Sequence, residues 1–289
     1  SILMGIQYGA KDYKTLHRQI STTMLSGMIF SFILTLFCVI CATPILHLLQ
    51  VDPSIMDMTR QYLRIIFMGL MFTFLYNFFS STLRALGDSA SPLYFLIISA
   101  VLNIFGDLFF VIVLKMTVNG VAIATVVSNA VSAVILMIRL TRTEQVIRVR
   151  REELRFDIPI FKRIIKIGLP AGIQTAVFAA ANIVVQSAIN SLGTIVMAAS
   201  STALNIEIFV YDILNSFGQA CTTFVGQNFG AGQLKRCKKV LLLCIVEDGI
   251  ATASMAALVL FFGRTLLAIF NNDPQVIELG YTRLLLIFS

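Results

Sequence analysis

SILMGIQYGAKDYK, residues 1–14, and TTFVGQNFGAGQLK, residues 222–235, are two copies of one pattern that lie 221 residues apart. At this offset the first 68 residues align with the last 68 residues without a gap. The identical landmarks are Gly5/Gly226, Gly9/Gly230, Ala10/Ala231, Lys14/Lys235, Asp52-Pro53/Asp273-Pro274, Leu63/Leu284, Ile66/Ile287 and Phe67/Phe288. Self-similarity of this length indicates a protein built from two similar lobes.

Composition places the chain in lipid. Hydrophobic residues make up 57% of it and charged residues only 13%, which is outside the usual range of soluble domains. Its formal net charge of +7 would suit an anionic partner such as nucleic acid, unless the basic residues are explained by membrane topology. The 5 cysteines have neither zinc-site nor disulfide spacing, so we expect reduced packing residues.

Eight apolar segments are long enough, or nearly so, to span a bilayer, whose core of about 30 Å needs about 20 helical residues. They lie near residues 19–45, 58–81, 92–114, 118–140, 164–190, 194–224, 238–263 and 276–289, of which the last is incomplete. The predicted fold class is therefore an all-α, polytopic integral membrane protein. Six span starts separate the two copies of the pattern, so both copies have the same orientation, as in parallel transporter repeats.

This arrangement predicts two parallel six-helix lobes in a protein of about twelve helices, of which the chain holds the third to the tenth. Two helices are then missing at each end. We predict an N-lobe at residues 1–140, a cytoplasmic interlobe linker at residues 141–160 and a C-lobe at residues 161–289. The linker is the most polar and charge-rich connection, as domain boundaries usually are.

The basic residues explain the orientation. When the connections alternate between sides, 17 of the 22 Lys and Arg fall together, and the positive-inside rule assigns that side to the cytoplasm. The residues left on the other side are Arg60, Arg64, Lys115, Arg264 and Arg283. We therefore predict a multi-pass protein of the plasma (inner) membrane with cytoplasmic basic loops. The run at Arg148, Arg150 and Arg151 is then a solvated loop, and no nucleic-acid partner is expected.

Five motifs together resemble one known family. They are Leu83-Arg84-Ala85-Leu86-Gly87-Asp88 with Pro92, Leu102-Asn103-Ile104 with Asp107, Asn119-Gly120-Val121, Gly168-Leu169-Pro170, and Gly226-Gln227-Asn228-Phe229-Gly230-Ala231-Gly232. Their order over essentially the whole chain is similar to that of the multidrug and toxic compound extrusion (MATE) transporters of the larger flippase and exporter superfamily.

The resemblance implies a V-shaped pair of six-helix lobes around a central cavity. It also implies exchange of drug-like, often cationic, compounds for sodium ions or protons. The best-studied ion-site carboxylate of the family lies in the first helix, which this chain lacks. Sodium-coupled relatives commonly carry a Glu about eight residues after the Gly-Leu-Pro proline, where this sequence has Phe178 and Ala179.

The N-lobe candidates are Asp107 and Asn103. Charged side chains inside a bilayer are costly and usually face protein or a water-filled cavity. Asn103 lies four residues before Asp107, so both share one helix face and offer oxygens to a proton or cation. The alternative is a helix-to-helix hydrogen bond that fixes the packing of the lobe.

In the C-lobe, a polar stripe recurs every seven residues at Asn205, Asp212 and Gln219, which is typical of a cavity wall. Glu207 lies off this stripe, so either Glu207 or Asp212 is the functional carboxylate, with structural pairing as the alternative. Gln174 and Asn182, spaced by a multiple of four, line the same cavity or join helices. Glu247 and Asp248 are expected near the cytoplasmic edge.

Catalytic motifs are not visible. The chain has only two histidines and no P-loop, HExxH or GxSxG pattern, so we expect neither an enzyme nor ATP-driven transport, and no cofactor or metal apart from the coupling ion, H+ or Na+. The predicted protein is a monomer in the lipid bilayer that exports small organic cations or other drug-like solutes. The alternatives are a lipid-linked oligosaccharide flippase, which needs a basic cavity, and a receptor or membrane enzyme.

Overall fold

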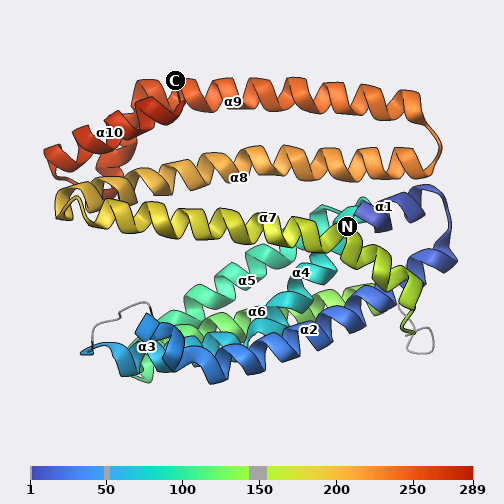
Figure 1. Cartoon of the computed structure of the whole chain (residues 1–289), viewed down its shortest axis with the longest axis horizontal. Coiled ribbons are helices and arrows are strands. Elements are labelled where there is room, and N and C mark those ends of the chain that lie inside the picture. Colours follow the sequence, from blue (N-terminus) through green and yellow to red (C-terminus); the bar gives the residue numbers. More distant parts are fainter. Residues whose placement is uncertain (1, 49–52, 143–154, 289) are drawn as a thin grey trace. The chain divides into compact units, whose positions relative to one another are not determined.

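The computed structural model describes residues 2–48, 53–142 and 155–288, and these residues form helices joined by short connections (Figure 1). The helices are α1 (Ile2–Gly9), α2 (Tyr13–Leu48), α3 (Met56–Met68), α4 (Leu70–Ala85), α5 (Ala90–Leu108), the π-helix η1 (Phe109–Val113), α6 (Val118–Arg142), α7 (Ile158–Asn190), α8 (Thr194–Gly230), α9 (Leu234–Phe270) and α10 (Pro274–Phe288). The predicted all-α fold class is confirmed.

Within the described residues, six helical segments are long and apolar enough to cross a membrane: α2, α5 with η1, α6, α7, α8 and α9. The predicted span at residues 58–81 lies in the right place but is not one straight helix. It consists of α3 and α4, which meet at an angle of 42° on either side of Gly69. A Cβ atom at Gly69 would lie 2.5 Å from Cγ2 of Val126 on α6, so only glycine lets the break approach α6 this closely.

The chain divides into two compact units, Ser1–Ile164 and Ile165–Ser289. The division falls inside α7, and most of the predicted linker lies outside the described residues, so the predicted lobe boundaries stay predictions. In the second unit α8 and α9 run side by side in opposite directions, and α10 packs against both near one end (Figure 1).

The start of α7 is tied to α2 within the first unit. Asp157 caps α7 by accepting a hydrogen bond from the backbone N–H of Ile160 (3.2 Å). The backbone N–H of Asp157 donates to the hydroxyl of the fully buried Thr22 on α2 (3.1 Å). The carboxylate of Asp157 lies 3.6 Å from the guanidinium of Arg18, also on α2. The last residues of the predicted linker, at the start of α7, are therefore anchored on the N-terminal unit.

Each unit has one compact apolar core, and most other apolar side chains face outward, as expected for helices in lipid. The core of the first unit joins α1, α2, α4 and α6 through Met4, Leu16, Ile20, Phe78, Phe79, Leu83, Ala85, Leu86, Leu136 and Leu140. That of the second unit joins α8, α9 and α10 through Ala203, Ile206, Val210, Val259, Leu267 and Leu284.

The sequence repeat is also a structural repeat. In the first copy, the backbone N–H of Lys11 donates to the carbonyl of Tyr8 and that of Asp12 to the carbonyl of Gln7 (both 3.0 Å). In the second copy, the N–H groups of the residues 221 positions later bond to the corresponding carbonyls, at 3.0 and 2.9 Å. Both pairs of bonds form a Schellman motif, which ends a helix with one left-handed residue.

The left-handed position of this motif holds different residues in the two copies. It is Lys11 (φ 56°) in the first and Gly232 (φ 72°) in the second, so a glycine takes the left-handed position only in the second copy. Asp12 follows as the cap of α2, where hydrogen bonds from the side chain and backbone of Thr15 lower the pKa of its carboxyl. The cap therefore stays ionised at neutral pH.

Lys11→Gly is expected to stabilise the full-length protein by about 1 kcal/mol, because a left-handed conformation is costly for a residue with a Cβ atom. The measurement is the thermal unfolding transition of the purified protein in detergent. Lys14→Gly is the matched control: Lys14 is helical in α2, so the same change there should destabilise the protein. A lower transition temperature for Lys11→Gly would contradict the interpretation.

Candidate functional site

The N-lobe candidates lie on the face of α5 that packs against α6. The amide nitrogen of Asn103 donates to the hydroxyl of Thr125 on α6 (3.3 Å), and that hydroxyl donates to the carbonyl of Val121 (3.0 Å). Asp107, one turn further along α5, has a buried Oδ1 atom with no hydrogen-bond partner among the described residues. A buried acceptor without a donor is costly, so the functional role predicted for Asp107 stays a prediction.

The backbone changes immediately after Asp107. The α-helix α5 gives way to the π-helix η1 at Phe109, where the N–H of Leu114 donates to the carbonyl of Phe109 (3.2 Å). Single π-turns inside helices are frequent at functional sites. Gly106, next to Asp107, brings α5 so near to α6 that a Cβ atom would lie 3.0 Å from that of Ala124. Asp107 thus lies in the chain between a close helix contact at Gly106 and the π-turn that begins at Phe109.

A largely buried ion pair lies between α8 and α10 in the second unit. Both carboxylate oxygens of Glu207 on α8 accept hydrogen bonds from Arg283 on α10, from Nε at 2.7 Å and from Nη2 at 3.0 Å. The two side chains are only 16% and 25% exposed. Such a planar, two-bond pair is among the strongest polar contacts in proteins. Glu207 is therefore structurally paired, which is the alternative that the sequence left open.

A second pair lies at the start of α10 and is exposed. Arg264 on α9 binds both carboxylate oxygens of Glu278 at 3.0 and 2.9 Å, and its guanidinium lies 4.4 Å from the ring centre of Tyr281. The hydroxyl of Tyr281 donates to the carbonyl of Leu260 on α9 (2.8 Å). Together the two pairs hold α10 against α8 and α9.

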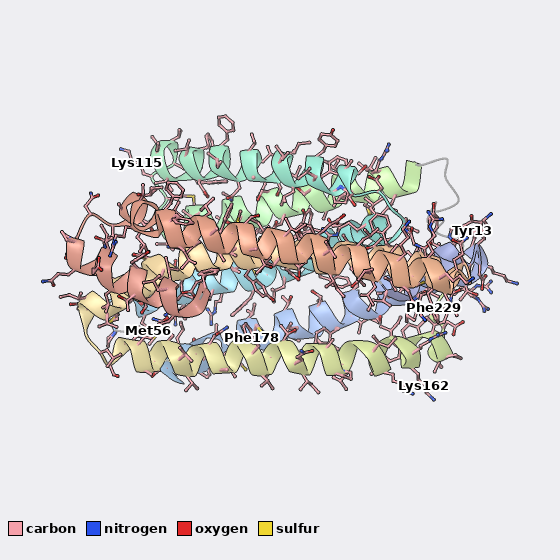
Figure 2. All side chains as sticks on the ribbon, turned by 90° about the horizontal axis from the view of Figure 1, so that it is seen from above. Tyr13, Met56, Lys115, Lys162, Phe178 and Phe229 are labelled. Carbon is pink, nitrogen blue, oxygen red and sulfur yellow. The ribbon has the colours of Figure 1, made fainter. Side chains whose placement is uncertain are left out.

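The remaining candidates are not brought together in the structure. Asn205 and Asp212 on α8 are exposed, and so are Gln174 and Asn182 on α7. Among the described residues of the second unit, no helix packs against α7, along which Figure 2 labels the exposed Phe178. The cavity wall predicted from these residues therefore stays a prediction.

Two partners were not predicted as site residues. Thr125 has an apolar sequence context, and only the contact between α5 and α6 brings it to Asn103. Arg283 could have been predicted from the sequence, because an Arg inside an apolar helical segment usually pairs with an acidic side chain. The structure describes no group of three or more His, Cys, Asp or Glu that could hold a metal ion.

The repeated helical units, the broken span and the acidic side chains within apolar helices define a multi-span α-helical membrane protein. The chain belongs to the MatE family, whose model matches residues 1–109 and 170–289. The resemblance inferred from the motifs is thereby confirmed.

Among curated proteins, the chain is similar to the probable multidrug resistance proteins YoeA and YpnP of Bacillus subtilis (strain 168). It is 29% identical to YoeA over 99% of this chain and 63% of that protein. It is 27% identical to YpnP over 96% of this chain and 62% of that protein. The chain thus spans a little over three fifths of the length of these relatives.

Among solved structures, the fold is similar to a crystal structure of MATE in complex with MaL6. The TM-score is 0.90 at 17% sequence identity, covering 99% of this chain and 64% of the other. At this level of identity the likeness shows the fold alone, and it confirms a MATE-type arrangement of helices.

Proposed function

We propose that the full-length parent of this chain is a secondary active exporter of organic, often cationic, drug-like compounds, driven by exchange for H+ or Na+. Family membership and relatives named as multidrug resistance proteins support export of such compounds. The observation that carries the coupling is the buried, unpartnered Oδ1 of Asp107 on the face of α5 that also bears Asn103.

The proposed mechanism is competition for one carboxyl group. Asp107 binds the coupling ion, and Asn103 adds its side-chain carbonyl oxygen, while its amide nitrogen donates to Thr125. Both oxygens suit a proton shared by hydrogen bonding and a small hard cation such as Na+. Binding of an organic cation favours the ionised, ion-free carboxylate, and binding of the coupling ion favours release of the drug. The two cargoes therefore exclude one another.

The proposed setting is the plasma (inner) membrane, with the basic loops in the cytoplasm and the protein acting as a monomer in the bilayer. The positive-inside distribution of Lys and Arg supports this orientation. Exported compounds then leave the cell as coupling ions enter down their gradient. The acids and scarce basic residues within the helices favour cationic over anionic cargo.

The test is ethidium efflux from energised cells that lack their own drug exporters and express the complete parent gene. We expect efflux that stops when one gradient, of protons or of sodium ions, is collapsed and continues when the other is. The gradient whose collapse stops efflux identifies the coupling ion. Absence of efflux for every cationic dye tried, despite good membrane expression, would contradict the proposal.

A further inference from the structure

Three cysteines lie on the faces through which α8 and α9 pack against each other. Between Leu234 and Ile250 the half-buried positions of α9 are 237, 240, 244 and 248, and this spacing of three and four marks one face of a helix. On α8 the half-buried positions include 214, 217, 221 and 225, which repeat at the same spacing. Cys237 and Cys244 belong to the first series and Cys221 to the second.

One contact fixes the register of the two helices. The thiol of Cys237 donates to the carbonyl of Val225 on α8 (3.7 Å), and the two helices run in opposite directions (Figure 1). Position 244, two turns further along α9, therefore faces the level of α8 that lies two turns before Val225, which is Gly218. Gly218 has no side chain, and a Cβ atom added there would meet no atom within 4 Å, so there is room beside Cys244.

The thiols of Cys244 and Cys221 converge across this interface. Helical side chains lean toward the N-terminus of their own helix. In an antiparallel pair Cys244 therefore leans from the level of Gly218 toward that of Val225, and Cys221, which lies between these levels, leans toward Gly218. The two thiols accordingly interact with each other in the structure. They belong to different helices, so the spacing of cysteines in the sequence does not reveal the pair.

Two converging sulfur atoms form a ligand set for a soft metal ion. Thiolates favour soft ions such as Cu+ over the hard ions that carboxylates bind, and Cu+ accepts two sulfur ligands in a linear arrangement. Such a site needs no third protein ligand. It is therefore compatible with the described residues, which contain no larger group of metal-binding side chains.

The pair lies near one end of the two helices. Lys238 and Lys239 precede Cys244 on α9, and five residues, or about 8 Å of helix, separate Lys239 from Cys244. Basic side chains mark the polar boundary of a membrane helix, so the thiols lie a short way inside this boundary. A metal ion can thus reach them from the aqueous phase, and displaced protons can leave by the same way.

We propose that Cys221 and Cys244 form a binding site for a soft monovalent metal ion of the Cu+ type, which bridges α8 and α9. Two S–H bonds break and two metal–sulfur bonds form, while both protons pass to water and no electron is transferred. The bridge joins the two helices near their polar ends. The site does not depend on the proposed transport function.

Copper binding to the purified full-length protein tests the site directly. The protein is kept under anaerobic, reducing conditions without added thiols, and Cu+ is supplied as its complex with the coloured chelator bicinchoninate. We expect the unaltered protein to withdraw Cu+ from the chelator, and both Cys221→Ser and Cys244→Ser to withdraw one equivalent less. Equal uptake by these three proteins overturns the proposal.

Cys237→Ser is the matched control for copper binding. Cys237 lies on the same face of α9 as Cys244, but its thiol contacts the carbonyl of Val225 and not a second thiol. This variant should withdraw as much Cu+ as the unaltered protein. A loss equal to that of Cys244→Ser would show that copper binds single thiols, and it would overturn the proposal too.

Thermal unfolding with and without Cu+ tests the bridge and also shows whether the variants are folded. An ion that binds only the folded state raises the transition temperature. Cu+ should therefore raise it in the unaltered protein and in Cys237→Ser, and leave it unchanged in Cys221→Ser and Cys244→Ser. If a Ser variant does not fold, the Ala variant at the same position takes its place. An equal rise in all four proteins overturns the proposed bridge.

Discussion

Replacing Asp107 by Asn in the full-length protein is expected to abolish gradient-driven export and leave a folded protein. The amide keeps the size of the side chain and its place beside Asn103, but it cannot exchange a proton or neutralise a bound cation. We expect efflux of ethidium to fall to the level of cells without the gene. The measurement is efflux from energised cells, with membrane expression and the thermal transition of the purified variant determined in parallel.

Asp57→Asn is the matched control for this variant. Asp57 lies in the same lobe, and its 80% exposed side chain pairs only with the neighbouring Arg60 on α3, so the same chemical change there should leave export intact. If Asp107 merely joins α5 to α6, Asn can replace it as a hydrogen-bonding group. Normal export by Asp107→Asn would therefore contradict the coupling role.

Replacing Arg283 by Ala is expected to destabilise the protein by about 3–5 kcal/mol, because Glu207 would keep its charge between helices without a partner. The expected result is a sharply lower thermal transition and reduced expression in the membrane. The matched control is Arg264→Ala, which breaks the other two-bond pair of α10. Since Arg264 and Glu278 are 60% and 63% exposed, the same substitution there should have a much smaller effect.

Exchanging the charges separates the ion pair from the packing of the two side chains. The double variant Glu207→Arg with Arg283→Glu restores opposite charges between α8 and α10. It should recover part of the stability that Arg283→Ala loses, as coupled residues do in a double-mutant cycle. The double variant is compared with the single variants Glu207→Arg and Arg283→Glu. If its loss of stability equals the sum of the losses of these two variants, the pair is not the source of the stability.

Most of the fold could be predicted from the sequence because the spans are set by local composition. Runs of apolar residues place the predicted spans within about seven residues of the observed helix bounds. The break between α3 and α4 could not be predicted in this way. It depends on how closely Gly69 approaches Val126 on α6, which is a contact between spans and not a property of either one.

In the candidate site, too, contacts within one helix could be predicted from the sequence and contacts between helices could not. Asn103 and Asp107 are four residues apart, so helical geometry alone brings them together. Glu207 and Arg283 are 76 positions apart, and their pairing follows only from the packing of α10 against α8.

In the proposed mechanism, ion movement through the carboxyl group of Asp107 drives export. The most direct measurement is dye transport by the purified full-length protein in proteoliposomes, with a proton or a sodium gradient as the only energy source. We expect one imposed gradient to drive dye transport in the unaltered protein and neither gradient to do so in Asp107→Asn. Dye transport of equal rate in both proteins, or transport that ignores both gradients, would contradict it.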